Sequence, residues 1–181
     1  MSTQILIVED ESIIAAHIRN ATQALGYEVL AVVAKAEDAL RQVEVSQPDL
    51  ILMDVRLSGD IDGIQAAEEI RAHFDIPIIY LTACADEETL NRAKITQPFG
   101  YLVKPFETRD LYSTIEIALY KHRMDKRLRQ SEARYRAIVE DQTELICRHW
   151  SDGTLSFVNS AFCRFFGASR EALLGSNFWS L

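Results

Sequence analysis

The sequence predicts an α/β fold for the N-terminal part of the chain: a doubly wound sheet of five parallel strands covered by helices. Two observations lead to this fold class. Short apolar runs alternate with longer stretches of helical character up to about residue 120. The apolar runs show no regular polar alternation, which is typical of strands that are buried on both faces of a parallel sheet.

The elements follow in a regular order along the chain. Strands are expected at residues 5–8, 29–33, 50–53, 78–81 and 101–103. Helices are expected at residues 12–25, 36–46, 63–74 and 86–96, with Gly26, Pro48, Pro77 and Gly100 as breaks. Right-handed crossovers then place ligands at the carboxyl ends of the strands.

Composition excludes several classes of protein. A formal net charge of −8 argues against non-specific binding to nucleic acid or to an anionic membrane surface. No apolar run approaches the roughly 20 residues of a membrane span, and the start MSTQILIVEDE is unlike a signal peptide. The cysteines Cys84, Cys147 and Cys163 form no C-x-x-C pair, so no disulfide framework or zinc site is expected. We expect a cytoplasmic protein without nucleic-acid or membrane partners.

Polar residues stand where the predicted strands end. Glu9 and Asp10 follow the first strand, Asp54 the third, Thr82 the fourth and Lys104 the fifth. Carboxylates brought together at one sheet edge repel each other unless a divalent cation and a lysine neutralise them. Oxygen ligands of this kind favour Mg²⁺, or Mn²⁺ in its place.

This constellation predicts phosphoryl transfer to a carboxylate. Asp54 would be the nucleophile beside a Lewis acid, because such a transfer needs little beyond positioning and charge neutralisation. Mg²⁺, Lys104 and the Thr82 hydroxyl could supply that neutralisation together. The expected product is an acyl phosphate on Asp54.

The same residues resemble the receiver domain of two-component response regulators. The resemblance rests on ILIVEDE, LILMDVRL, the Asp62-Gly63 pair, YLTA and GYLVKPF, all in order at strand ends. It covers residues 3 to about 122 and implies the flavodoxin-like strand order 2-1-3-4-5. It also implies that a sensor histidine kinase phosphorylates Asp54.

The resemblance assigns further roles to single residues. The metal ligands would be Glu9, Asp10, Asp54 and the backbone carbonyl of Arg56. Thr82, Ala83 and Lys104 would bind the phosphoryl group, Thr82 and Tyr101 would form the switch pair, and the Lys104–Pro105 peptide bond would be cis.

The sequence departs from the family pattern at a few positions. The loop LSGDIDG is one residue longer than usual and has Ser58 where the family usually has proline. Glu9 replaces the more frequent aspartate. Arg56 and Cys84 occupy the positions that tune the lifetime of the phosphorylated state in this family.

A long helix is expected to follow the receiver part. The stretch from Leu111 to Gln142 lacks Gly and Pro, and residues 123–140 are assigned as a helical linker. Heptad-spaced residues form a seam with polar interruptions at Lys121 and Ser131; they are Met124, Leu128, Ser131, Tyr135 and Ile138. A solvated connector and a parallel homodimeric coil both fit, and the context favours the homodimer.

Residues 141–181 resemble the N-terminal part of a PAS sensory domain. ELICRHW and LSFVNSAF flank the hairpin signal Asp152-Gly153, and Ser169 and Gly175 fit the start and stop of a short helix. A complete PAS fold needs further strands, so a longer parent chain or a partner would complete its sheet. Cys147, His149 and Cys163 are taken as core and hairpin positions, and no haem or flavin is expected.

The sequence therefore predicts a response regulator that relays phosphorylation of Asp54 through the helix to a PAS module. It would catalyse only its own phosphorylation and dephosphorylation, since neither His17 nor His122 has the surroundings of a phosphodonor histidine. A non-phosphorylated scaffold or dimerisation module is an alternative, although such a chain would lose the acid pair or the lysine. An aspartyl-phosphate phosphatase is another, but it needs D-x-D where this chain reads Glu9-Asp10-Glu11.

Overall fold

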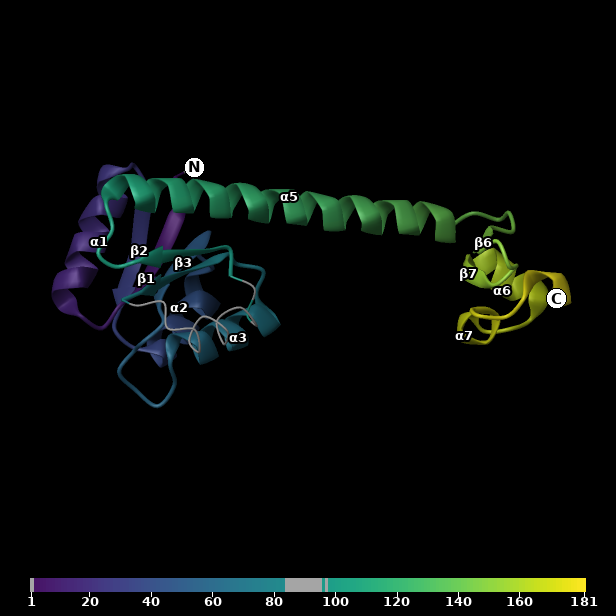
Figure 1. The fold of residues 1–181 in the computed structure, drawn as a ribbon, viewed down its shortest axis with the longest axis horizontal. Coiled ribbons are helices and arrows are strands. Elements are labelled where there is room, and N and C mark those ends of the chain that lie inside the picture. The colour runs from purple at the N-terminus through teal and green to yellow at the C-terminus, as the bar shows by residue number, and fades with distance from the viewer. Residues whose placement is uncertain (1, 84–95, 97) are drawn as a thin grey trace. The chain divides into compact units, whose positions relative to one another are not determined.

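The computed structural model describes residues 2–83, 96 and 98–181, which form two compact units. Unit 1 is Met1–Met124 and unit 2 is Asp125–Leu181 (Figure 1). The helix expected at residues 86–96 and the residue Cys84 lie outside the described residues, apart from Thr96.

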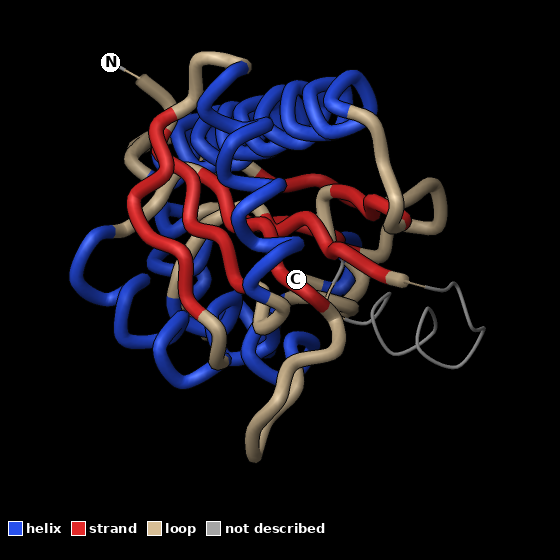
Figure 2. The backbone as a smooth tube through the Cα atoms, turned by 90° about the vertical axis from the view of Figure 1, so that its left-hand side faces the viewer, coloured by secondary structure: helices blue, strands red, loops and turns tan. Residues whose placement is uncertain are grey.

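Unit 1 contains the predicted sheet. Its five parallel strands lie in the order β2-β1-β3-β4-β5, which confirms the predicted fold class and strand order (Figure 2, strands in red). The strands are β1 (Gln4–Val8), β2 (Glu28–Val33), β3 (Leu50–Asp54), β4 (Ile78–Thr82) and β5 (Gly100–Val103).

The central strands are buried on both faces, as their continuous apolar sequences require. Leu6, Ile51 and Tyr80 belong to one core cluster, and Ile5 and Leu52 belong to the other. Alternate residues of each strand thus pack on opposite sides of the sheet, where the helices cover them. This burial holds the carboxyl ends of β1, β3 and β4 in fixed positions.

Four helices of the described residues belong to unit 1 or begin in it. They are α1 (Ser12–Ala24), α2 (Ala36–Ser46), α3 (Gly63–His73) and α5 (Thr108–Glu140). Helix α3 begins with a capping box, in which the Asp62 carboxylate accepts from the Gln65 N–H and the Gln65 side chain accepts from the Asp62 N–H, both at 2.9 Å. Helix α5 is one uninterrupted element of 33 residues, which confirms the predicted long helix (Figure 1).

Unit 2 has its own small core. Strands β6 (Cys147–His149) and β7 (Leu155–Val158) form the predicted antiparallel hairpin, followed by α6 (Ser160–Phe166), α7 (Arg170–Leu173) and the 3₁₀ helix η1 (Phe178–Ser180). Leu155, Val158, Phe162 and Leu173 are buried together. Across the described part of the chain, no helix combines the length and the apolar character that crossing a membrane requires.

Candidate functional site

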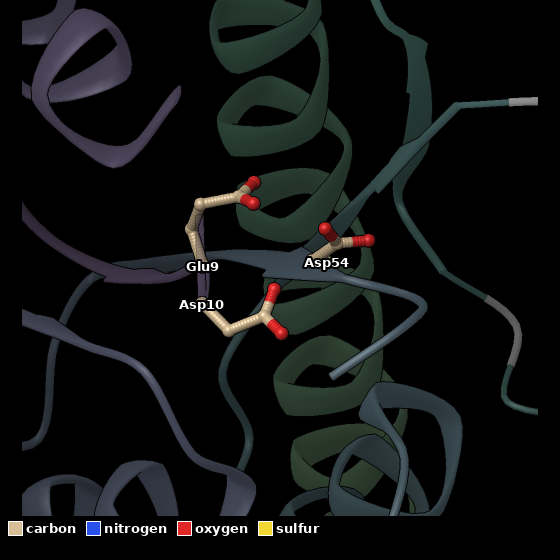
Figure 3. Close-up of side chains that lie close together, drawn as sticks. All are labelled: Glu9, Asp10 and Asp54. Atoms are coloured by element: carbon tan, nitrogen blue, oxygen red, sulfur yellow. The ribbon is translucent and has the colours of Figure 1, made fainter. Parts of the chain in front are cut away.

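Three carboxylates gather at the carboxyl edge of the sheet. Glu9 and Asp10 follow β1 and Asp54 ends β3, and one oxygen from each lies within 4.8 Å of the others (Figure 3). They meet because β1 and β3 are neighbours, with Val8 opposite Met53. Glu9 and Asp54 are buried, whereas Asp10 is half-buried at the mouth of the cluster. The structure therefore brings together the three acids that the sequence placed at strand ends.

Lys104 joins two of these carboxylates. Its ammonium donates to Glu9 Oε2 at 2.5 Å and to Asp54 Oδ2 at 2.6 Å. The Lys104 backbone N–H donates to the Thr82 carbonyl at 2.7 Å, which continues the β4–β5 pairing, and the Lys104–Pro105 peptide bond is cis. Lys104 thus reaches β3 and β1 from the far side of β4.

The charges at this site are unbalanced. Burial raises the pKa of Glu9 to about 7, the neighbouring Asp54 charge adds to this, and the hydrogen bond from Lys104 opposes it. Burial alone would lower the pKa of Lys104, but its hydrogen bonds to Asp54 and Glu9 outweigh burial and raise it. The ammonium therefore remains charged and offsets one carboxylate, so a divalent cation would neutralise the other two.

The loop after β3 supports the acids. The Arg56 N–H donates to Asp54 Oδ1 at 3.0 Å. The Ser58 hydroxyl and N–H donate to Asp10 Oδ2 at 2.5 Å and 3.1 Å. In the sequence, Ser58 stands out only as a departure from the family pattern, and no sequence signal indicates that it orients Asp10.

Gly63 lets α3 approach Asp54. A Cβ at this position would stand 1.8 Å from the Asp54 carbonyl oxygen and 2.9 Å from the Asp54 carbonyl carbon. No side chain can occupy that space, so the Asp62-Gly63 motif has a steric cause. The close contact fixes the backbone of Asp54 against the first turn of α3.

The remaining candidates lie on β4 and β5 or directly after them. Thr82 is buried at the end of β4, one residue beyond the Asp54–Leu81 pair, and Ala83 follows it at the surface. The Tyr101 ring packs on the Tyr80 ring at 5.9 Å between centroids. Among the described residues, the buried Tyr101 hydroxyl has no hydrogen-bond partner. The roles of these residues, and of the Arg56 carbonyl as a metal ligand, stay predictions.

The donor set fits a hard divalent cation. All three side chains offer carboxylate oxygen, the loop can add a backbone carbonyl, and no soft ligand from the described residues belongs to the cluster. Two buried acids are bridged by one ammonium, and the third, half-buried acid lies beside them.

Comparison with known sequence families agrees with this geometry. Residues 5–116 match the family described as the response regulator receiver domain, and residues 133–180 match the PAS fold. This chain belongs to the response regulator receiver family, a family of signalling proteins that act in two-component systems with sensor histidine kinases.

Individual relatives support the assignment. The transcriptional regulatory protein PdtaR of Mycobacterium tuberculosis is 36% identical over 120 residues, which is 66% of this chain and 58% of that protein. The chain thus spans little more than half the length of this relative.

Two solved structures are similar in fold. The signal receiver domain of a modulated diguanylate cyclase from Desulfovibrio desulfuricans has a TM-score of 0.66 and 39% identity, covering 69% of this chain and 99% of that one. The receiver domain of the sensor histidine kinase PA1611 from Pseudomonas aeruginosa has a TM-score of 0.61 and 34% identity, covering 66% and 98%. That structure holds a magnesium ion in its active site cleft.

Proposed function

We propose that this chain is a phosphorylation-driven response regulator in which Asp54 accepts a phosphoryl group from a sensor histidine kinase. The observation that carries the proposal is the bridge of Lys104 between buried Glu9 and Asp54, beside the more exposed Asp10. This arrangement presents a carboxylate nucleophile among groups that neutralise an incoming phosphoryl group.

The chain's own residues prepare the transfer. Glu9, Asp10 and Asp54 would hold Mg²⁺, with the Arg56 carbonyl as a further ligand. When bound, the ion supplies positive charge to the phosphoryl oxygens. An Asp54 carboxylate oxygen forms a bond to phosphorus while the phosphorus–nitrogen bond of phosphohistidine breaks, and the released imidazole takes up a proton. Lys104, and the Thr82 hydroxyl with the Ala83 backbone, then bind the transferred group.

An apolar surface beside the site fits the kinase. A cavity of 490 Å³ is lined by Ile13, Ile14, His17 and Phe106, and it reaches Lys104. Ile13 is 85% exposed, so water surrounds an apolar side chain close to the acceptor. A helical phosphodonor domain that packs on this surface would bring its phosphohistidine to Asp54.

The relay is the second part of the proposal. The family match to the receiver domain includes the first part of α5, and the match to the PAS fold includes its last part. The middle of the helix lies between the two matched regions. Phosphorylation of Asp54 changes the switch residues Thr82 and Tyr101, and α5 passes that change to the PAS part. We include a homodimer along α5, since exposed apolar residues continue on this helix beyond unit 1. The boundaries 1–122, 123–140 and 141–181 describe these three parts.

Intact-mass spectrometry with phosphoramidate tests the acceptor chemistry. The wild-type chain should gain one phosphoryl group only with Mg²⁺, and Asp54→Asn should gain none. Asp60 is an exposed loop residue, so Asp60→Asn should still gain one phosphoryl group.

Ile13→Asp tests the apolar surface: it should keep phosphorylation by phosphoramidate and lose phosphorylation by a histidine kinase. A chain that gains no phosphoryl group with Mg²⁺ would support the scaffold alternative instead.

A further inference from the structure

Ser58 occupies one oxygen of the Asp10 carboxylate. Its hydroxyl donates to Asp10 Oδ2 at 2.5 Å, and its N–H donates to the same atom at 3.1 Å. A carboxylate oxygen has two lone-pair sites, so these two donors fill Oδ2. Within the part of the chain that the structure describes, Oδ1 accepts no hydrogen bond. Asp10 therefore keeps Oδ1 for a different ligand.

The orientation of Asp10 suits a cation shared with the other two acids. One oxygen of Asp10 lies within 4.8 Å of an oxygen of Glu9 and an oxygen of Asp54, and Figure 3 shows one Asp10 oxygen turned toward Asp54. Two oxygens on opposite sides of a Mg²⁺ ion stand roughly 4.2 Å apart. The three acids thus need only small movements to share one ion, provided that Asp10 keeps this orientation.

The loop after β3 fixes Ser58 through its two neighbours. Leu57 packs against the core cluster that contains Ile51 and Tyr80. Gly59 has φ +151°, a conformation that residues with a side chain rarely adopt, and it turns the chain directly after Ser58. The Ser58 side chain is exposed, so it is the backbone of this loop that presents its hydroxyl to Asp10.

The two hydrogen bonds are particular to a serine at this position. The proline that receiver domains usually have here could make neither bond, because proline has no hydroxyl and no N–H. Asp10 is half-buried, so without these bonds its side chain could rotate, and a cation would have to order it on binding.

We infer that Ser58 is a positioning residue of the cation site: it holds Asp10 by Oδ2 and thereby directs Oδ1 at the cation. This inference rests on the proposed function and adds a residue that sets the affinity for the ion. Loss of a group that hydrogen-bonds to a metal ligand typically weakens metal binding by about 10- to 100-fold. Because Ser58 is exposed, we expect an effect at the lower end of that range.

A titration of the full chain with Mn²⁺ tests the inference. Mn²⁺ takes the same oxygen ligands as Mg²⁺, and electron paramagnetic resonance counts the free ion and so gives the dissociation constant. Ser58→Ala should raise this dissociation constant by about tenfold, whereas Ser58→Thr keeps the hydroxyl and should stay within about twofold of wild type.

Ser12→Ala is the matched control. Ser12 is also exposed and lies two residues from Asp10, but within the described residues its hydroxyl makes no hydrogen bond. Its replacement should leave the dissociation constant unchanged. Urea unfolding without a divalent cation should give the same midpoint for Ser58→Ala as for wild type, since the role of Ser58 concerns the bound ion.

The outcomes separate Ser58 from the site as a whole. A Ser58→Ala chain that binds Mn²⁺ as tightly as wild type, or more tightly, would overturn the positioning role. Weaker binding that Ser58→Thr does not restore, or that comes with a lower urea midpoint in the absence of cation, would assign the effect to the fold of the loop and overturn the role as well. A wild-type chain that binds no Mn²⁺ would remove the cation site itself, and with it the proposed function.

Discussion

At the scale of single residues, the site depends on one cation that is already present. Lys104 is 10% exposed and contacts two acids that are more buried still. Removing one partner of a buried ion pair costs more than the pair contributes, because the other charge stays buried and unpaired. Lys104 therefore holds the acidic site of the free protein together, and in the proposed reaction it also binds the phosphoryl group.

Lys104→Met should destabilise unit 1 by about 3 kcal/mol without Mg²⁺, because Glu9 and Asp54 lose their shared counter-charge. Added Mg²⁺ should restore part of this loss, since a divalent cation replaces the missing charge. Urea unfolding followed by circular dichroism measures the loss of stability. Trp150 and Trp179 both lie in unit 2, so their fluorescence reports the unfolding of that unit separately. The exposed Lys35 provides a control, and Lys35→Met should change stability by less than about 0.5 kcal/mol. Equal losses in the two variants would contradict the proposed role of Lys104.

Gly63→Ala should cost unit 1 about 3 kcal/mol or more, because its Cβ would overlap the Asp54 carbonyl oxygen at 1.8 Å. Gly26→Ala separates overlap from backbone strain: Gly26 has φ +89° but open space around its Cβ position, so about 1 kcal/mol is expected. The same urea experiment compares them. A Gly63 variant as stable as the Gly26 variant would show that the contact can relax.

The acids were predictable from the sequence because each ends an apolar run, and parallel strands bring such ends to one edge. Asp54, Glu9, Asp10 and Lys104 could thus be predicted as neighbours, but the distances between them could not. The role of Ser58 was not predictable, because its hydroxyl reaches Asp10 across 48 positions of sequence through a loop whose path no pattern encodes.

At the scale of elements, the end of α5 is bonded firmly into unit 2. The fully buried Asn159 amide donates to the carbonyls of Val139 at 3.2 Å and Glu144 at 2.9 Å. Its oxygen accepts from the N–H groups of Ile146 at 3.1 Å and Phe162 at 3.0 Å. One side chain thus joins the last turn of α5, the strand entry and the cap of α6.

Asn159→Ala should lower the free energy of unfolding of unit 2 by about 3 kcal/mol, because four backbone groups, among them the buried Phe162 N–H, lose the partner that a fully buried side chain gives them. Tryptophan fluorescence during urea unfolding measures this. Gln142→Ala is the control: its exposed side chain makes one hydrogen bond, to the Ile138 carbonyl, and should matter little. If Asn159→Ala unfolds at the wild-type urea concentration, the joint does not depend on this amide.

The stability of unit 2 should fall in acid through Glu140. Hydrogen bonds from the Ser160 hydroxyl and N–H, together with the Arg170 charge, hold the pKa of Glu140 below its usual value. Arg136, one turn earlier on α5, lines the same surface depression. A lowered pKa in the folded state means that this stabilisation is present above about pH 4.3 and disappears as the pH falls through the folded-state pKa.

Urea midpoints from tryptophan fluorescence at a series of pH values measure this effect. Glu140→Gln should unfold more easily at neutral pH and should lose this part of the acid dependence. A wild-type midpoint that falls in acid by no more than that of Glu140→Gln would assign the dependence to other groups.

The presence of the long helix and of the hairpin was predictable from the sequence, but the hydrogen bonds that join them were not. The absence of Gly and Pro predicted the long helix, and Asp152-Gly153 predicted the β6–β7 hairpin. The Asn159 joint was not predicted, since its backbone partners Val139 and Glu144 lie 20 and 15 residues away and backbone groups leave no trace in sequence.

At the scale of the whole molecule, one chain carries a receiver part and a PAS part, with α5 beginning in unit 1 and ending in unit 2. Each part has its own core, so phosphorylation chemistry in unit 1 can be measured in the intact chain while tryptophan reports unit 2. The proposed function depends on Asp54 becoming an acyl phosphate.

Borohydride trapping tests that claim most directly. Reduction converts an aspartyl phosphate to homoserine, and peptide mass spectrometry then identifies the modified residue. After treatment with phosphoramidate and Mg²⁺, we expect homoserine at position 54 in the wild-type chain, and none when Mg²⁺ is omitted or Asp54 is replaced by asparagine. Glu9 cannot give homoserine, because its side chain is one methylene longer than that of aspartate. Homoserine at another aspartate such as Asp10, or an unreduced Asp54 in a chain that has gained phosphate, would contradict the assignment of Asp54 as the acceptor.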